Sequence, residues 1–220
     1  MERRRRRRLH VAGVVLIGAG VGVLGWVGWQ LWGTTWVSQR QHDQIAAELQ
    51  QEWRDGEQVV QLEEGPATAL VEIPAFGRGY RVPLLEGTGE DALAAGFGHF
   101  VDTQAPGQIG NFGLAGHRTT HGEPLADMPD LQPGDKVVVT TADAIYTYVL
   151  DTGGDDLVVG FDETWVLDPS PVNPQGGVQP QQSDDLRSGQ RLLTLVTCAE
   201  LFHTDERLVA FGHLDSTTRR

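Results

Sequence analysis

The sequence predicts an all-β domain that follows one apolar helix and a helical stalk. From Ala69 onward, short apolar runs are separated by glycine and proline at intervals of roughly 8–12 residues, which is typical of a β-barrel or a β-sandwich. Uncharged residues fill positions 9–37 directly after a run of arginines, and the segment that follows has helical spacing. The expected divisions are a basic cytoplasmic tail at 1–8, a transmembrane anchor at 9–37, a stalk and linker at 38–68, a β domain at 69–215 and a C-terminal tail at 216–220.

The N-terminus predicts a single membrane span. Six consecutive arginines, Arg3–Arg8, precede an apolar core at Val11–Trp29, and about 20 such residues cross a bilayer as a helix. Tryptophans gather at the far end, as in an interfacial aromatic belt: Trp26, Trp29, Trp32 and Trp36. The arginines favour a cytoplasmic N-terminus, which places the β domain outside the cell. The alternatives are a cleaved signal peptide, whose apolar region would be shorter, and nucleic-acid binding by the arginines.

The part of the chain after the basic tail is strongly acidic. The whole chain has 17 Lys+Arg and 30 Asp+Glu, and without Glu2 and Arg3–Arg8 these become 11 and 29, a formal charge of −18. A surface of this sign argues against nucleic acid and anionic lipid as partners of the β domain. Solubility outside the cell is the simpler interpretation of the charge.

The elements follow from local spacing. In the stalk, Ile45, Leu49 and Trp53 have the i, i+4 spacing of a helix that ends near Asp55–Glu57. A short helix is expected at Glu90–Gly96, stopped by glycine, and the proline- and glutamine-rich Asp168–Gly189 is expected to be a long loop. The expected strands are Ala69–Gly77, Tyr80–Gly87, Asn111–His117, Lys136–Thr141, Ile145–Leu150, Asp156–Gly160, Glu163–Asp168, Arg191–Cys198 and Arg207–Leu214.

The only cysteine, Cys198, ends the apolar strand that begins at Arg191. A thiol nucleophile needs a positive environment that favours its thiolate. If the last two strands pair, the loop at 199–206 returns Arg207 to the side of Cys198, and its guanidinium cannot titrate away. The alternatives are a buried, inert cysteine or a dimer link, and for Arg207 a surface ion pair with Asp205 or Glu206.

A general base must come from another part of the chain. His117 ends an apolar strand and is followed by polar, turn-forming residues, which is where a barrel presents a side chain at its rim. Taken alone, His117 is more typical of a structural histidine than of a catalytic one.

Four motifs together resemble the sortase family: GNFGLAGHR at Gly110–Arg118, LQPGDKVVV at Leu131–Val139, TLVTC at Thr194–Cys198, and the downstream Arg207. The resemblance covers about Ala69–Leu214. The details IPAFG, GFGHFVDTQAPGQIGN and LDP look most like the class E (housekeeping) sortases of high-GC Gram-positive bacteria.

The resemblance implies an eight-stranded sortase-type β-barrel with short helices, and a membrane-anchored cysteine transpeptidase. Such an enzyme cleaves a C-terminal Leu-Ala/Pro-Xaa-Thr-Gly sorting signal between Thr and Gly through a thioacyl intermediate. It then attaches the secreted protein to an amine of a peptidoglycan precursor. The matching catalytic positions are His117, Cys198 and Arg207, and the expected substrate-binding positions are Phe100, Leu195 and Thr197. No cofactor is expected.

The sequence departs from the class E pattern at one position. Class E sortases usually have a tyrosine where this chain has Phe100, and that tyrosine is associated with a preference for alanine over proline at the second position of the signal. The preference is therefore left open, as is the role of the 168–189 loop, which could line the peptide groove or be a tolerated insertion. No metal site is expected, since the acidic run Asp151–Asp156 is more typical of a solvated turn.

Two other functions are compatible with the same residues. A cysteine hydrolase would use the same three side chains and release the peptide to water, so only the amine acceptor distinguishes it from a transpeptidase. A degenerate, non-catalytic anchored binding module is the third hypothesis, and the intact histidine, cysteine and arginine argue against it.

Overall fold

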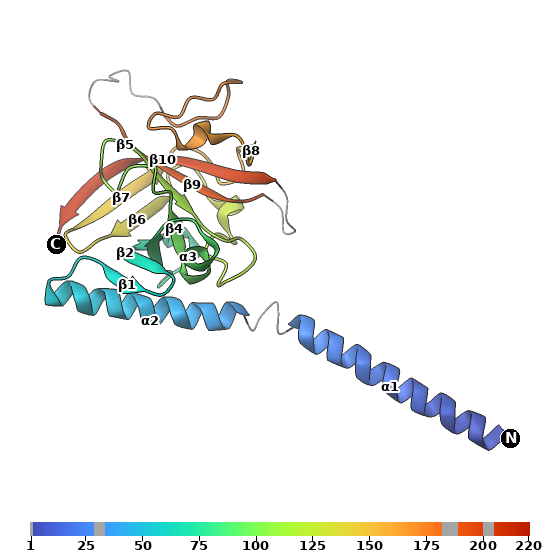
Figure 1. The fold of residues 1–220 in the computed structure, drawn as a ribbon. Coiled ribbons are helices and arrows are strands. Elements are labelled where there is room, and N and C mark those ends of the chain that lie inside the picture. Colours follow the sequence, from blue (N-terminus) through green and yellow to red (C-terminus); the bar gives the residue numbers. More distant parts are fainter. Residues whose placement is uncertain (1, 29–33, 182–188, 200–204) are drawn as a thin grey trace.

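The computed structural model describes residues 2–28, 34–181, 189–199 and 205–220, without the side chains of 2–12, 27–28 and 34–36. Ten strands form one sheet (Figure 1). The strands are β1 (Val60–Leu62), β2 (Gly65–Glu72), β3 (Val82–Glu86), β4 (Phe97–His99), β5 (Gly110–Ala115), β6 (Lys136–Thr140), β7 (Ala144–Leu150), β8 (Val158–Gly160), β9 (Arg191–Cys198) and β10 (Glu206–Arg219).

Eight of these strands close into a barrel. The order along the sheet is β2-β3-β4-β5-β9-β10-β7-β6, and β6 pairs back with β2 through Leu70 and Thr140. Closure pairs the backbone N–H and C=O groups that the edge strands of an open sheet would leave exposed. β1 pairs with β2 and β8 with β10, so these two strands lie outside the ring. The eight-stranded barrel expected from the sequence is therefore confirmed.

Alternation of side chains along the strands divides the apolar residues between the interior and the outer faces of the barrel. The interior is filled from every wall by residues such as Val71, Leu84, Leu114, Tyr148 and Leu195. Residues of opposite parity, such as Val209 and Phe211 on β10, face outward and lie beneath a 3₁₀ helix, η4 (Thr164–Leu167). The outer face near η4 is therefore covered rather than solvated.

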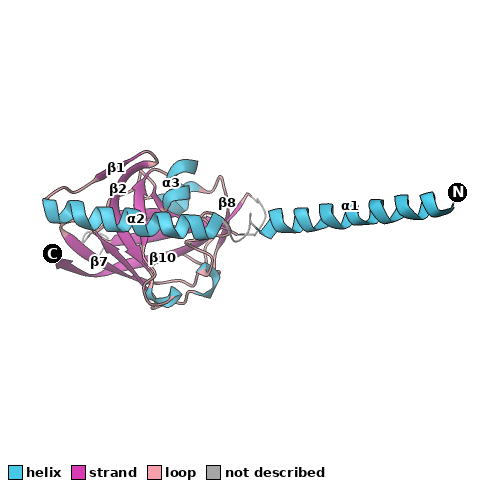
Figure 2. Cartoon of the chain, turned by 90° about the horizontal axis from the view of Figure 1, so that it is seen from below, coloured by secondary structure: helices cyan, strands magenta, loops and turns pink. Residues whose placement is uncertain are grey.

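The segment expected to be a stalk is a helix, α2 (Thr34–Asp55), and it lies along the barrel (Figure 2). Ile45, Ala46 and Leu49 are buried against the outer face of β2 and β3 and against the short helix α3 (Glu90–Ala95). The i, i+4 spacing predicted the helix correctly, and the apolar stripe that it creates is buried by the barrel.

The N-terminal segment forms a helix, α1 (Glu2–Gly28). Over the residues that the structure describes, no helix combines the length and the apolar character needed to cross a membrane. The anchor predicted at 9–37 is thus not supported by the structure.

Two local predictions were wrong. Glu163–Asp168, expected to be a strand, contains η4, because its backbone carbonyls are held by Asn111 rather than by a ladder partner. Residues 216–219, expected to belong to a tail, continue β10 and pair with β7 up to Arg219. The helix at Glu90–Ala95 and the hairpin of β6 and β7 are confirmed. Of the long loop at 168–189, residues 182–188 lie outside the described part.

Candidate active site

Cys198 and Arg207 are directly opposed in the antiparallel ladder of β9 and β10. Paired residues point to the same face of a sheet with Cβ atoms about 5 Å apart. Both have the parity of Val196 and Val209, so they share the outer face of the barrel. The ladder continues one step further, because the Ala199 amide donates to the Glu206 carbonyl over 3.0 Å. The expected return of Arg207 to Cys198 is confirmed at the level of the backbone.

The Arg207 side chain has two described contacts. Its guanidinium lies 5.1 Å from the centre of the Phe161 ring, a cation–π distance. One of its terminal nitrogens donates to the Glu206 carbonyl over 2.8 Å. Neither of these two contacts is with a carboxylate.

His117 is brought to Cys198 by the parallel pairing of β5 with β9. The register places Ala115 opposite Val196. The Gly116 amide then donates to the Val196 carbonyl over 3.2 Å, and the Thr197 hydroxyl donates to the Gly116 carbonyl over 2.8 Å. Continued two residues past the last pair of the ladder, the same register would bring His117 level with Cys198. Two strands distant in sequence thus place the predicted histidine, cysteine and arginine at one end of the barrel.

The loop after His117 is tied to the residue after Cys198. The Arg118 guanidinium donates to the Ala199 carbonyl. The His117 ring stacks on that of His121, with ring centres 5.1 Å apart and planes inclined by 31°. His121 was not among the predicted site residues, and only its spacing of four residues from His117, in a run of turn-forming residues, could have drawn attention to it.

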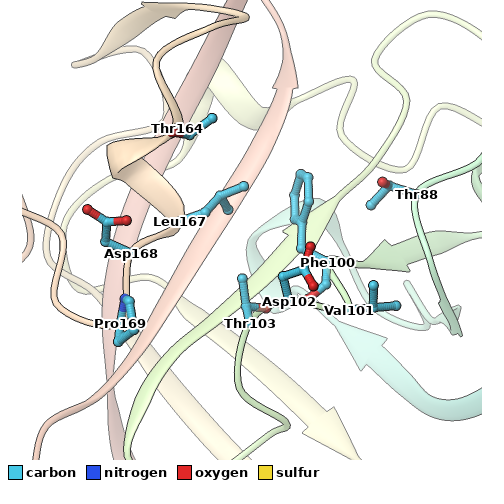
Figure 3. A pocket seen from close by; sticks show the side chains of 9 residues that line it. All are labelled: Thr88, Phe100, Val101, Asp102, Thr103, Thr164, Leu167, Asp168 and Pro169. Carbon is cyan, nitrogen blue, oxygen red and sulfur yellow. Dashed lines mark hydrogen bonds between the residues drawn. The ribbon is translucent and has the colours of Figure 1, made fainter.

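A cavity of about 370 Å³ opens on the same outer face. Its lining residues are Thr88, Phe100, Val101, Asp102, Thr103, Thr164, Leu167, Asp168 and Pro169 (Figure 3). A Cβ on Gly113 would meet Leu167, Phe100 and Thr103 at 3.0–3.2 Å, so this glycine lies beneath the cavity. Gly113 pairs with Thr194, four residues from Cys198 on β9, which is about 13 Å along a strand.

Buried hydrogen bonds hold the η4 side of this cavity. The Asn111 side-chain amide donates to the Val166 carbonyl over 3.0 Å and to the Asp168 carbonyl over 3.1 Å. The Thr194 hydroxyl is within hydrogen-bond distance of Asn111 Oδ1, at 2.9 Å, and of the Val166 carbonyl, at 3.1 Å. These polar groups are buried, so their bonds are costly to break.

The opposite side of the cavity is held by Thr103 and His99. The Thr103 hydroxyl donates to the Phe100 carbonyl over 2.7 Å and accepts from the Gly113 amide over 3.0 Å. Behind it, His99 Nδ1 lies 2.8 Å from Glu86. This hydrogen bond from His99 lowers the pKa of Glu86 below its usual range, although partial burial of the carboxyl opposes the shift. The hydrogen bond to Glu86 thereby fixes His99, the residue directly before the cavity-lining Phe100.

The predicted substrate-binding residues do not all face this surface. Phe100 lines the cavity, as expected for a residue that contacts substrate. Leu195 is fully buried inside the barrel, because side chains alternate along β9 and its parity is opposite to that of Cys198. The Thr197 side chain is also buried, and its hydroxyl is used by the Gly116 carbonyl. The burial of these two side chains leaves only the backbone of Leu195 and Thr197 available for the substrate contact expected of these residues.

No group of three or more His, Cys, Asp or Glu side chains that could hold a metal ion occurs among the described residues. In the acidic run Asp151–Asp156, Asp156 accepts from the Gly153 amide over 2.6 Å. Asp151 lies 2.7 Å from His213 Nδ1. These carboxylates are engaged in local structure.

Comparison with known proteins identifies the family, because the sortase domain family matches residues 71–215. The chain belongs to the sortase family. Sortase E1 of Streptomyces coelicolor is 33 % identical over 210 residues, which are 92 % of this chain and 56 % of that protein. The chain therefore spans little more than half the length of that relative. Sortases of this family are cysteine transpeptidases.

Solved sortase structures have the same fold. Sortase E of Streptomyces avermitilis superposes with a TM-score of 0.57 and 39 % identity, over 69 % of this chain and 89 % of that one. The crystal structure of Streptomyces coelicolor sortase E1 with a tripeptide in its active site gives 0.59 and 32 %, over 73 % and 94 %. The resemblance to class E sortases is therefore confirmed.

Proposed function

We propose that this chain is a sortase that cleaves a sorting signal of the type Leu-Ala/Pro-Xaa-Thr-Gly between Thr and Gly, and transfers the new carboxyl end to an amine. The observation that carries the proposal is the convergence of His117, Cys198 and Arg207 at the same end of the barrel. A thiol, an imidazole and a permanent cation are the groups that acyl transfer through a thioester requires.

The first half of the reaction forms the thioester. The Cys198 thiolate attacks the threonine carbonyl carbon, and the carbonyl oxygen becomes an oxyanion. The bond from that carbon to the glycine nitrogen then breaks as protonated His117 gives its proton to the leaving amine. Arg207 is level with Cys198 on the neighbouring strand, where its charge can stabilise the oxyanion or orient the peptide.

The second half transfers the acyl group. An incoming amine attacks the thioester carbon and loses a proton to neutral His117. The bond to sulfur breaks, Cys198 leaves as a thiolate, and a new amide is formed. The acceptor proposed from the family resemblance is an amine of a peptidoglycan precursor.

The cavity beside Gly113 supports a peptide substrate in extended form. With the threonine carbonyl at Cys198, the leucine three residues upstream would lie about 10 Å away along a strand. The cavity lies about 13 Å along β9 from Cys198 and presents the apolar side chains of Phe100 and Leu167. An apolar pocket at about the distance expected for the first residue of the signal supports the proposal.

We also propose that residues 9–37 anchor the chain in the membrane, with the N-terminus in the cytoplasm and the barrel outside. This rests on Arg3–Arg8 and the apolar core at Val11–Trp29. Alkaline extraction of membranes and protease treatment of intact cells test it. Release of the full-length chain by alkali, or protection of the barrel from external protease, would contradict this placement.

The proposed activity is tested with the full chain in detergent and two fluorogenic peptides, one Leu-Ala-Xaa-Thr-Gly and one Leu-Pro-Xaa-Thr-Gly, with and without a triglycine acceptor. We expect Thr–Gly cleavage and an amine-ligated product, and no product from Cys198→Ala or His117→Ala. His213→Gln, at a partly exposed histidine on β10, is the matched control and should remain active. Cleavage without ligation would favour the hydrolase, and a folded chain that cleaves neither peptide would overturn the proposal for these signals.

A further inference from the structure

The ring of His117 has a second histidine as a direct neighbour. The His117 and His121 rings lie 5.1 Å apart and are inclined by 31°, a separation at which two aromatic rings are in contact. Within the part of the chain that the structure describes, His121 Nδ1 is buried and has no hydrogen-bond partner. At this nitrogen, His121 is therefore not tied to the protein by a hydrogen bond, and the ring contact with His117 is its described interaction.

The backbone around His121 is unusual. His121 and Glu123 have φ values of 53° and Gly122 has a φ of 80°, so three successive residues adopt the left-handed conformation. This conformation is unfavourable for a residue with a side chain, and surrounding contacts must compensate for it. The Glu123 amide donates to the Thr120 carbonyl over 3.0 Å, and the Leu125 amide donates to the His117 carbonyl over 2.9 Å. These bonds fold the loop so that the His121 ring returns to His117.

The helix α2 holds this loop from the other side. A Cβ on Gly122 would lie 2.7 Å from His42 Cε1 and 3.2 Å from Ser38 Cβ, so the loop and the helix are in close contact. Ser38 and His42 are 6 % and 4 % exposed. Burial lowers the pKa of His42 to about 4, with nearby Asp43 opposing the shift, so the ring that packs against Gly122 is neutral at neutral pH. Continuous packing therefore connects α2 to the loop that carries His121.

We propose that His121 is a positioning residue for His117, and that α2 fixes His121 through the contact of Ser38 and His42 with Gly122. The inference rests on the proposed function, in which His117 first gives and later takes a proton. Both transfers require the imidazole at hydrogen-bond distance from the reacting nitrogen. A stacked neighbour restricts rotation of the His117 ring about its side-chain bonds. Helix α2, which precedes the barrel, thereby helps to orient His117.

The test compares His121→Ala with His121→Phe in the full chain. Removing the ring should lower kcat on the order of 10-fold to 100-fold, the scale expected for a misplaced catalytic group, while KM and the thermal unfolding midpoint stay close to wild type. His121→Phe keeps an aromatic face and should recover most of the activity. Thr120→Ala, at the exposed neighbouring side chain, is the matched control and should have no effect.

A second measurement does not depend on activity. In a Cys198→Ala background, the ring-proton resonances of His117 should shift when His121→Ala removes the neighbouring ring current, and much less when His42→Ala is made. In the active chain, His42→Ala should lower kcat a few-fold with KM unchanged, because it loosens the packing behind Gly122.

Three outcomes would overturn the proposal. The first is a His121→Ala variant with unchanged kcat and unchanged His117 resonances. The second is an equal loss of kcat in His121→Ala and His121→Phe, which would indicate proton relay instead of positioning. The third is full activity in His42→Ala, which would remove the role of α2. If the wild-type chain cleaves neither peptide, the proposed function fails, and the resonances still report whether His121 orients His117.

Discussion

Arg207 lies directly opposite Cys198 in the β9–β10 ladder, so the distance between the cation and the thiol is set by the strand register. The two residues are separated in sequence by a loop of eight, Ala199–Glu206. The ladder continues past Cys198 through the hydrogen bond from the Ala199 amide to the Glu206 carbonyl. The pairing of the two strands therefore fixes the backbone of Arg207 relative to that of Cys198.

Replacing Arg207 by lysine should reduce activity strongly. Lysine keeps the charge but loses the planar, forked donor that can orient a peptide carbonyl and stack on Phe161. We expect kcat/KM for peptide cleavage to fall on the order of 100-fold, as for removal of one oxyanion-stabilising donor. Arg219→Lys, at the exposed end of the same strand, is the matched control. Equal activity of the two variants would show that Arg207 contributes only charge.

Replacing Phe100 by tyrosine should change the choice between the two signals. Phe100 lines the cavity, and a tyrosine hydroxyl there would add a hydrogen-bond donor where the substrate passes. We expect Phe100→Tyr to raise kcat/KM for the Leu-Ala peptide relative to the Leu-Pro peptide, measured in one competition assay. Val59→Thr, which adds a hydroxyl at an exposed position outside the cavity lining, should leave the ratio unchanged. A ratio that does not move in Phe100→Tyr would remove Phe100 from signal discrimination.

Acidification should weaken the contact between α2 and the barrel. Burial lowers the pKa of His42 from its ordinary 6.5 to about 4, so between these values the unfolded state binds more protons than the folded state. The contribution of His42 to the free energy of unfolding is therefore fully present above pH 6.5 and decreases as the pH falls toward 4. The decrease amounts to about 3 kcal/mol.

Urea unfolding at pH 7.5, 5.5 and 4.5 measures this effect. His42→Gln removes the titrating group and should show a smaller loss of stability between pH 7.5 and 4.5 than the wild type. Parallel pH dependences of the wild type and His42→Gln would contradict the assignment.

Replacing Thr194 by valine should loosen the η4 side of the cavity. The hydroxyl is buried between Asn111 Oδ1 and the Val166 carbonyl, and its loss leaves these groups without that partner. We expect a loss of about 1–3 kcal/mol in the free energy of unfolding and a raised KM for the peptide, measured by thermal unfolding and steady-state kinetics. Thr217→Val, on the exposed part of β10, should change neither quantity.

Much of the fold could be predicted from local patterns. Short apolar runs bounded by turn-forming glycine and proline predicted β6, β7 and β9 closely, because turn geometry depends on neighbours in sequence. Glu163–Asp168 was assigned wrongly for the opposite reason. Its apolar Trp-Val-Leu run is compatible with a strand, and the Asn111 and Thr194 side chains, which are distant in sequence, hold it as η4.

The candidate site divides in the same way. Cys198 and Arg207 could be paired from the sequence because one short loop connects their strands. Leu195 lies next to the site in sequence, but strand parity turns its side chain into the core. His121 and the cavity residues Leu167 and Thr103 had no comparable local signal, since what they contact comes from other elements.

The sequence by itself determined most of the segments that become strands, several of the turns between them, and which three side chains have the chemistry for acyl transfer. These are properties of residue type and short spacing. Only the tertiary structure decided that β5 lies parallel to β9, so that the end of β5 brings His117 toward Cys198. It also decided that α2 lies against the barrel, with His42 packed against Gly122. Both arrangements depend on the closed barrel, because its closure brings segments that are distant in the sequence next to one another.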